Sequence, residues 1–432
     1  MYISKVNLKN IRGFTDLQFD LTREDGTYAG WTVFTGDNGS GKSTLLKTIA
    51  VGLVGKDAAR ALQPSFLGWI RDGATNGAVI QLQVVRSEDD DFVVGSGKLP
   101  ADNFPAKLEL RNGGREPALT AVVPLGEQKR YSSPIRSIWS PNARGWFSCG
   151  YGPFRRVFGA SPEAMRQMVA STSERFVTMF QEAASLAEVD QWLRNLKYKE
   201  LENREAEREQ LEMLLEILSD DLMPNQMTID RVDSDGLWLM DRNGVQLAWG
   251  EMSDGYRIAL ALLADIIRHL ITAYGVGGLT ERGEDGRIRI KRSGVVLIDE
   301  VDAHLHPEWQ REIGFWLKRH FPNIQFLVST HSPIICQAAD TNGLFVLPEP
   351  GSDLQPRALT KEEYEKVIAS RPDTILLTSA FGLQNTRSPR AVEGRAEYAR
   401  LQAKRRAGAK LTREEEVKLG QLELFAVVEE EL

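Results

Sequence analysis

Eight residues early in the chain match the pattern G-x-x-x-x-G-K-[ST], whose residue types suit phosphate binding. The run is Gly36-Asp37-Asn38-Gly39-Ser40-Gly41-Lys42-Ser43, and Thr44 follows it. Glycines let the backbone curl until its N–H groups face phosphate oxygens, while the lysine reaches the outer phosphates and the serine hydroxyl ligates Mg²⁺. We therefore expect ATP to contact Gly36, Asn38, Gly39, Ser40, Gly41, Lys42, Ser43 and Thr44, with Lys42 also assisting catalysis and Ser43 also holding the metal.

A pair of acidic residues follows the apolar run at 295–298. Such a run predicts a buried strand that delivers Asp299 and Glu300 to the sheet edge where phosphate binds. Asp299 is expected to hold Mg²⁺ through its water shell, and Glu300 is expected to orient or deprotonate the attacking water. The alternative is a purely structural acidic pair.

A histidine follows the next apolar run, at 324–328, within Ser329-Thr330-His331-Ser332-Pro333. His331 should emerge at the same sheet edge and contact the terminal phosphate, although a lone histidine at a strand end is often structural. His304 and His306 also stand close together in the sequence. No third ligand accompanies them, so we expect packing there rather than metal binding.

The elements around these motifs predict an α/β fold. Strands are expected at 2–11 and 31–34, a helix at 45–54, and antiparallel hairpins at 78–123. Helix starts are expected at Thr360 and Thr412, because each is followed three residues later by glutamate in the capping-box pattern. The expected parts are an N-terminal lobe at 1–160, a helical insertion at 161–225, a C-terminal lobe at 226–357 and a helical appendage at 358–432.

The composition of the chain bears on whether it binds membranes or nucleic acid. The 432 residues are 42% hydrophobic and 26% charged, and no run is apolar enough to span a membrane, so we expect a cytoplasmic protein. A net charge of −7 argues against an overall grip on nucleic acid. The tail, however, is locally basic, which favours non-specific nucleic-acid contact or, alternatively, a solvated helix face. Its basic residues are Arg387, Arg390, Arg395, Arg400, Lys404, Arg405, Arg406 and Lys410.

The run Glu251-Met252-Ser253-Asp254-Gly255-Tyr256-Arg257 resembles the Leu-Ser-Gly-Gly-Gln signature of ABC ATPases. The resemblance implies that Ser253 and Gly255 bind the γ-phosphate held by an opposite protomer, although Asp254 departs from the family wording. Asp302 matches the D-loop position, which couples the two sites of the dimer. The run at 150–156 matches the Q-loop position but has no glutamine, so its function would fall to the backbone or to Arg155 and Arg156. The alternative is a purely structural turn.

Together these motifs, with the start at 2–14, resemble the bacterial ATPases related to RecF and SMC heads over most of residues 1–345. The resemblance implies an ABC-type P-loop head with a mixed, largely parallel central sheet and an antiparallel β lobe. Within that group the chain looks most like Septu and retron-associated antiphage ATPases, with the PARIS ATPase as an alternative.

Such likeness implies homodimers or higher oligomers joined through ATP-bound heads. It also implies an effector from the same operon, an HNH or Toprim-type nuclease, and no membrane partner. The alternatives are a RecF-like repair ATPase acting directly on DNA and, less favoured, the energising subunit of a transporter.

Overall fold

The computed structural model describes residues 1–87, 90–93, 100–140, 143–155, 157, 173–182, 186, 188–223, 227–349, 352 and 354–427. By packing, the chain divides into two units, Met1–Ile375 and Leu376–Leu432. None of the helices in the described ranges is long and apolar enough to cross a bilayer.

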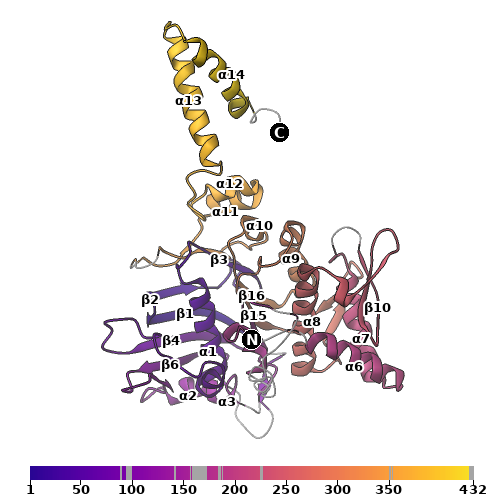
Figure 1. Ribbon diagram of the computed structural model, residues 1–432. Coiled ribbons are helices and arrows are strands. Elements are labelled where there is room, and N and C mark those ends of the chain that lie inside the picture. Colours follow the sequence, from indigo (N-terminus) through magenta and orange to yellow (C-terminus); the bar gives the residue numbers. More distant parts are fainter. Residues whose placement is uncertain are drawn as a thin grey trace. The chain divides into compact units, whose positions relative to one another are not determined.

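A six-stranded sheet forms the centre of the first unit (Figure 1). In spatial order its strands are β18 (Arg357–Ala358), β17 (Leu344–Val346), β3 (Gly30–Thr35), β16 (Ile324–Ser329), β15 (Gly294–Ile298) and β9 (Ser148–Tyr151). Neighbouring strands are parallel except at the β18 edge. Every residue of β15 and β16 is buried, as expected for a parallel sheet covered on both faces.

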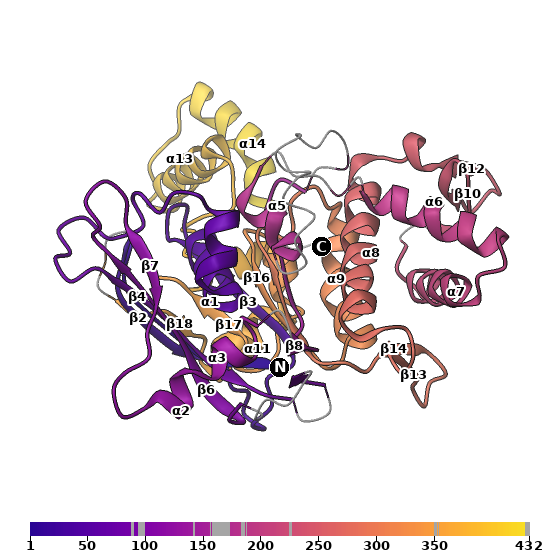
Figure 2. The same cartoon turned by 90° about the horizontal axis from the view of Figure 1, so that it is seen from below.

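A second, antiparallel sheet of five strands forms a lobe beside the central sheet. Its order is β2 (Phe14–Asp20), β1 (Tyr2–Ile11), β4 (Ala78–Val85), β6 (Asn103–Arg111) and β7 (Ala118–Ala121). Strand β4 alternates buried and half-buried residues, which is the pattern of a sheet with one face in the core. Helix α1 (Lys42–Leu62) packs between the two sheets and contacts strands of both (Figure 2). The lobe therefore fixes the helix that begins at Lys42.

Two long helices, α8 (Asp254–Tyr274) and α9 (Pro307–His320), lie on the side of the central sheet away from α1 (Figure 2). Helices α6 (Glu188–Leu201) and α7 (Glu205–Ser219) pack on α8 and give the insertion predicted at 161–225 its helical part. Residues 161–172, 183–185, 187, 224 and 225 of that prediction lie outside the described ones. Smaller strands are β5 (Phe92–Val93), β8 (Ala143–Arg144), β10 (Thr228–Asp233), β11 (Gly236–Met240), β12 (Gln246–Ala248), β13 (Thr280–Arg282) and β14 (Ile288–Ile290). The remaining helices of the first unit are α2 (Gln128–Tyr131), α3 (Ser133–Arg136), α5 (Val177–Phe180), α10 (Pro333–Cys336) and α11 (Lys361–Ala369), with α12 (Pro372–Leu376) at its end.

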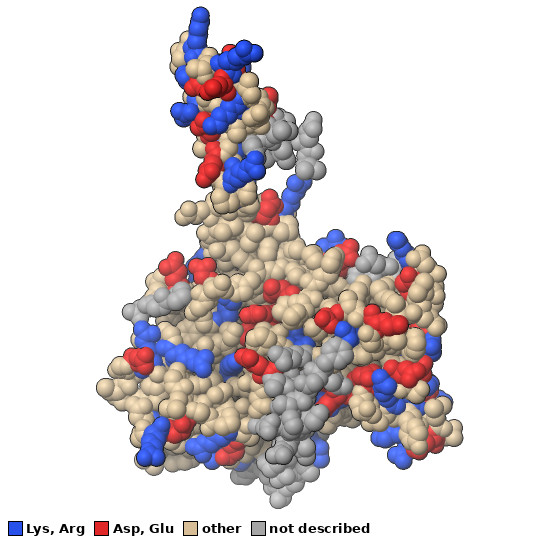
Figure 3. Space-filling model, in the orientation of Figure 1, with Lys and Arg blue, Asp and Glu red and all other residues tan. Residues whose placement is uncertain are grey.

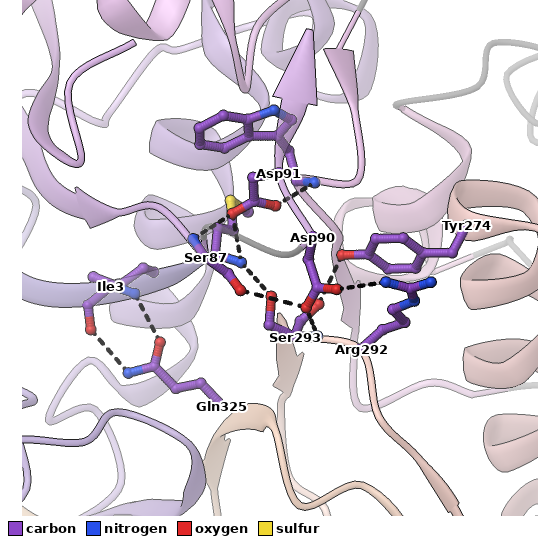
Figure 4. Close-up of polar contacts among 10 residues, drawn as sticks. Ile3, Ser87, Asp90, Asp91, Tyr274, Arg292, Ser293 and Gln325 are labelled. Carbon is purple, nitrogen blue, oxygen red and sulfur yellow. Dashed lines mark hydrogen bonds and ion pairs between the residues drawn. The ribbon is translucent and has the colours of Figure 1, made fainter. Parts of the chain in front are cut away.

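A buried polar network ties the first strand to the central sheet (Figure 4). The Gln325 amide pairs with both the N–H and the carbonyl of Ile3, at 2.8 Å each. The Met1 ammonium lies 2.9 Å from an Asp91 carboxylate oxygen and donates to the Ser293 hydroxyl at 2.7 Å. Asp90 accepts from the Ser293 N–H at 2.6 Å. These contacts fix the lobe against the central sheet with hydrogen bonds as well as apolar packing.

The second unit contains a helical hairpin, α13 (Pro389–Arg406) and α14 (Arg413–Val427). Lys404 lies 2.7 Å from Glu415, and Lys418 lies 3.1 Å from Glu397, so ion pairs join the two helices. The Thr412 N–H donates to Glu415, and the Glu415 N–H donates back to the Thr412 hydroxyl. This reciprocal pair is the predicted capping box, and the same arrangement starts α11 at Thr360. The predicted boundary at residue 357 remains a prediction.

Candidate functional site

The glycine-rich turn connects β3 to α1 and contains three residues in the left-handed region. Gly36, Gly39 and Gly41 have φ of 137°, 83° and 96°. A Cβ on Gly41 would lie 2.5 Å from the Phe14 ring, and one on Gly36 would lie 2.8 Å from the Ser40 hydroxyl. Only glycine fits this path, which leads the backbone N–H groups to the start of a long helix.

Lys42 folds back over the turn that precedes it. Its ammonium donates to the carbonyls of Gly36 at 2.7 Å and Asp37 at 3.0 Å, and the residue is 6% exposed. Burial lowers the pKa of Lys42, while nearby carboxylates, Asp299 and Glu300 foremost, oppose that shift. A buried cation beside carboxylates is suited to receive the negative charge of a phosphate.

The remaining predicted residues of the turn differ in exposure. Asn38 and Gly39 are exposed, and Ser43 and Thr44 are half-buried at the start of α1. The hydroxyl of Ser40 is buried and has no hydrogen-bond partner among the described residues. A buried hydroxyl of this kind fits a position where a ligand oxygen completes the hydrogen bonds.

The two carboxylates leave the end of β15 in different environments. Asp299 is fully buried, and its Oδ1 accepts from the Ser329 hydroxyl at 2.5 Å. Its Oδ2 is buried without a partner among the described residues. Glu300 is half-buried with φ of 48°, and its N–H donates to the Ser329 hydroxyl at 2.8 Å. Ser329 therefore holds the two acids together, a role that the sequence reasoning did not assign.

The segment after β16 lies against the loop that contains Asp302. The Thr330 hydroxyl donates to Asp302 Oδ1 at 2.5 Å and accepts from the Ser332 N–H at 2.9 Å. His331, which lies between Thr330 and Ser332 in the sequence, is exposed. Thr330 is a second residue that the sequence reasoning missed; its place directly after a buried strand of the parallel sheet was the available signal.

Ser253 and Gly255 lie at the N-terminus of α8, on a separate element. Ser253 occupies the N-cap position and is exposed, and Asp254 pairs with Arg257 of the next turn. A Cβ on Gly255 would lie 2.7 Å from the His304 carbonyl, so the helix start approaches the loop that follows Asp302. Among the described residues, no hydrogen bond or ion pair joins Ser253 or Gly255 to the glycine-rich turn of the same chain.

The predicted Q-loop position follows β9. The Asp299 N–H donates to the Tyr151 carbonyl at 2.8 Å, so this strand end lies directly beside the acidic pair. The side chain of Arg155 is buried beneath the loop that begins with this acidic pair. Arg156, the other arginine of the prediction, lies outside the described residues.

The residues at this sheet edge fit a magnesium nucleotide. Mg²⁺ takes oxygen ligands, commonly one or two from the protein with the rest from phosphate and water. The unpartnered Oδ2 of Asp299 and the half-buried hydroxyl of Ser43 are ligands of this type. Within the described ranges no group of three or more His, Cys, Asp or Glu side chains could hold a metal by itself. The donor set therefore suits a metal that arrives with phosphate oxygens.

The glycine cradle, the buried lysine and the paired acids on a mostly parallel sheet define a P-loop nucleotide-binding protein. The chain belongs to the family described as AAA domain, putative AbiEii toxin, Type IV TA system, whose model matches residues 31–337. The predicted P-loop α/β fold, with a mixed, largely parallel central sheet and an antiparallel lobe, is confirmed.

Two relatives carry names that agree with the resemblance. A retron Ec83 probable ATPase from Escherichia coli is 41% identical over 111 residues, 25% of this chain and 18% of that protein. The Septu protein PtuA from Bacillus mycoides (strain KBAB4) is 24% identical over 388 residues, 89% of this chain and 45% of that protein. The chain thus spans less than half the length of either relative. A crystal structure of the SmcHead bound to the C-winged helix domain of ScpA has a TM-score of 0.47 at 16% identity, covering 84% of this chain and 99% of that chain.

Proposed function

We propose that the chain is an ABC-type ATPase that binds and hydrolyses Mg-ATP between two copies of itself and regulates an antiphage effector, a nuclease or another toxic protein. The ATPase proposal is supported above all by the unpartnered Asp299 Oδ2 beside Glu300 and the glycine cradle. The defence proposal rests on similarity to proteins named for retron and Septu systems.

Each residue of the cradle has a distinct task in this proposal. Lys42 neutralises the outer phosphates, and Ser43 and Asp299 hold Mg²⁺, which supplies further charge neutralisation when bound. Glu300 accepts a proton from the attacking water, because its half-buried carboxylate lies one residue beyond the metal ligand. His331 contacts the terminal phosphate from the end of the neighbouring strand.

The second copy completes the site. Ser253 and Gly255 stand at an exposed helix N-terminus, whose N–H groups and dipole favour anions, yet no described hydrogen bond joins them to the cradle of their own chain. Their place beside the loop after Asp302 gives each copy a route by which one site senses the other.

Glu300→Gln tests the ATPase proposal. The variant should bind ATP, turn over at least 100-fold more slowly and accumulate as a closed dimer, because the amide cannot accept the proton. Turnover is measured by phosphate release and dimerisation by native mass spectrometry. Glu308→Gln on α9 is the matched control and should behave as wild type. Normal turnover by Glu300→Gln would remove that residue from its role, and unchanged ATP affinity in Lys42→Ala would contradict the cradle.

Purification with untagged gene neighbours tests the regulatory proposal. Native mass spectrometry with and without ATP should detect a stable complex that contains a second protein. A chain that never retains a neighbour would contradict the effector part while leaving the ATPase part intact.

A second candidate, a RecF-like ATPase that acts directly on nucleic acid, is favoured by the turn of the second unit's hairpin. Residues 404–413 contain no acidic residue, and four exposed cations there pair with none of the described residues: Arg405, Arg406, Lys410 and Arg413. Figure 3 shows basic side chains at this end of the hairpin. Salt-sensitive DNA binding that Arg405→Glu/Arg406→Glu weakens, and that Arg311→Glu on α9 does not, would support this candidate.

A further inference from the structure

Arg155 is buried beneath the loop that contains the acidic residues. It follows β9 in the sequence, and 1% of its surface is exposed. Its Nη1 donates to the carbonyls of Gly152 at 3.1 Å and Asp299 at 2.8 Å. Its Nη2 donates to the carbonyls of Glu300 at 2.9 Å and Ala303 at 3.2 Å. A longer contact from Nη2 reaches the Val301 carbonyl at 3.5 Å, so one guanidinium contacts four carbonyls of the loop and anchors them to the end of β9.

The loop needs such support because its backbone is strained. Glu300 and His304 have φ of 48° and 68°, in the left-handed region that residues other than glycine rarely adopt. Conformations of this kind persist where surrounding contacts over-determine them. At Glu300 the N–H donates to the Ser329 hydroxyl, and the carbonyl accepts from both Arg155 and the Ala303 N–H, the latter at 2.9 Å. Removal of Arg155 leaves the Glu300 backbone with two described hydrogen bonds, one from its N–H to Ser329 and one from the Ala303 N–H to its carbonyl.

The charge of Arg155 also matters to the three neighbouring acids. Burial lowers the pKa of Arg155 to about 10, while the negative charges of Asp299, Asp302 and Glu300 oppose the shift. The side chain therefore stays cationic at neutral pH, on the side of the loop where it contacts backbone carbonyls. A lysine can supply the charge but not the planar fork of donors that reaches several carbonyls at once.

We propose that Arg155 is a positioning residue: its guanidinium fixes the backbone at Glu300 so that this carboxylate meets the attacking water, and it makes no contact with nucleotide. The inference rests on the proposed ATPase function. It gives the Q-loop position, which lacks glutamine, an indirect role: Arg155 acts by holding the loop that contains Glu300. Loss of Arg155 should therefore slow hydrolysis and leave ATP affinity nearly unchanged. Loss of a residue that only stabilises the fold should lower thermal stability without this split.

The test compares Arg155→Met and Arg155→Lys with wild type. In both, kcat should fall, about 100-fold for methionine, the cost expected of a misplacement near 1 Å, and less for lysine. The Kd for a fluorescent ATP analogue should change less than threefold. Arg60→Met is the matched control, since Arg60 also donates to a backbone carbonyl, that of Leu119 at 3.0 Å, away from the acids. Its kcat should equal that of wild type.

A double-mutant cycle that measures kcat in Arg155→Met, Glu300→Gln and the double variant separates action through Glu300 from a purely structural role. If Arg155 acts through Glu300, the double variant should be no slower than Glu300→Gln alone, because the carboxylate to be positioned is already gone. Multiplying losses, unchanged kcat in Arg155→Met, or a Kd that rises in step with the fall in kcat would each overturn the inference. If Arg155→Met does not fold, the same cycle with Arg155→Lys decides. A wild type without ATPase activity would instead refute the proposed function.

Discussion

Replacement of Asp265 on α8 should lower the free energy of unfolding of the first unit by an amount that depends on pH. It accepts from the Tyr151 hydroxyl at 2.9 Å, and it lies 2.8 Å from Arg268 and 3.2 Å from His269. Burial alone would raise the pKa of Asp265, but His269 and Arg268 outweigh burial and hold that pKa well below its usual value. Asp265→Asn keeps the size of the side chain and removes the charge on which these contacts depend.

The expected loss follows from the partners left behind. Breaking a buried pair by removing one charge typically lowers the free energy of unfolding by roughly 3–5 kcal/mol. Arg268 keeps a second partner, since Glu174 lies 3.0 Å from it, so we expect the lower end, about 3 kcal/mol. A carboxyl with a lowered pKa stabilises the folded state above its unfolded pKa and loses that effect as the pH falls. The difference between wild type and variant should therefore be full at pH 7 and shrink below about pH 4.

Urea unfolding followed by circular dichroism at pH 7, 5 and 3.5 measures this difference. Asp57→Asn is the control, because that side chain is 82% exposed and its pair with Lys56 should contribute little. A loss below about 1 kcal/mol at pH 7 would refute the reasoning that the charge is held by its neighbours. So would a loss of equal size at pH 7 and at pH 3.5.

Two further substitutions probe other buried polar groups. Asp91→Ala leaves the buried Met1 ammonium without its carboxylate and should lower the free energy of unfolding by about 4 kcal/mol. Asp102→Ala is the control, because the Asp102 side chain is 76% exposed and its loss should change stability little. Thermal unfolding measures both variants, and similar midpoints would contradict this prediction. Burial lowers the pKa of His320, whose ring contacts the Ile288 carbonyl, so below about pH 6.5 the unfolded chain binds a proton that the folded chain does not. Stability should fall from pH 7 to pH 5, by at most about 1.4 kcal/mol per pH unit for this group, and His320→Gln should flatten that dependence.

Local patterns were sufficient to predict the strands and helix that surround the glycine-rich turn. The alternating run at 78–85 became β4, and the capping boxes at Thr360 and Thr412 both formed. These features depend on residues within a few positions of one another, so the sequence displays them directly.

Contacts between distant segments were beyond the reach of such patterns. Ser329 joins two acids that precede it by about thirty residues, and Arg155 reaches a loop about 145 residues away. An arginine after a glycine-rich turn looks like any exposed cation until the parallel pairing of β9 with β15 is known. The positions of the predicted site residues agree with the motifs, and Glu300→Gln and Lys42→Ala test the proposed roles of two of them.

The pairing of β3 has a consequence for synthesis on the ribosome. Both neighbours of this strand in the sheet, β16 and β17, begin about 300 residues later. Ile3 likewise bonds Gln325, which is synthesised 322 residues later. At about 5–20 residues per second, the first strands remain without these partners for roughly 15–65 s. During that interval the apolar strand before the cradle is open to wrong pairing. Nascent chains of this protein should therefore depend on chaperones until β17 has emerged.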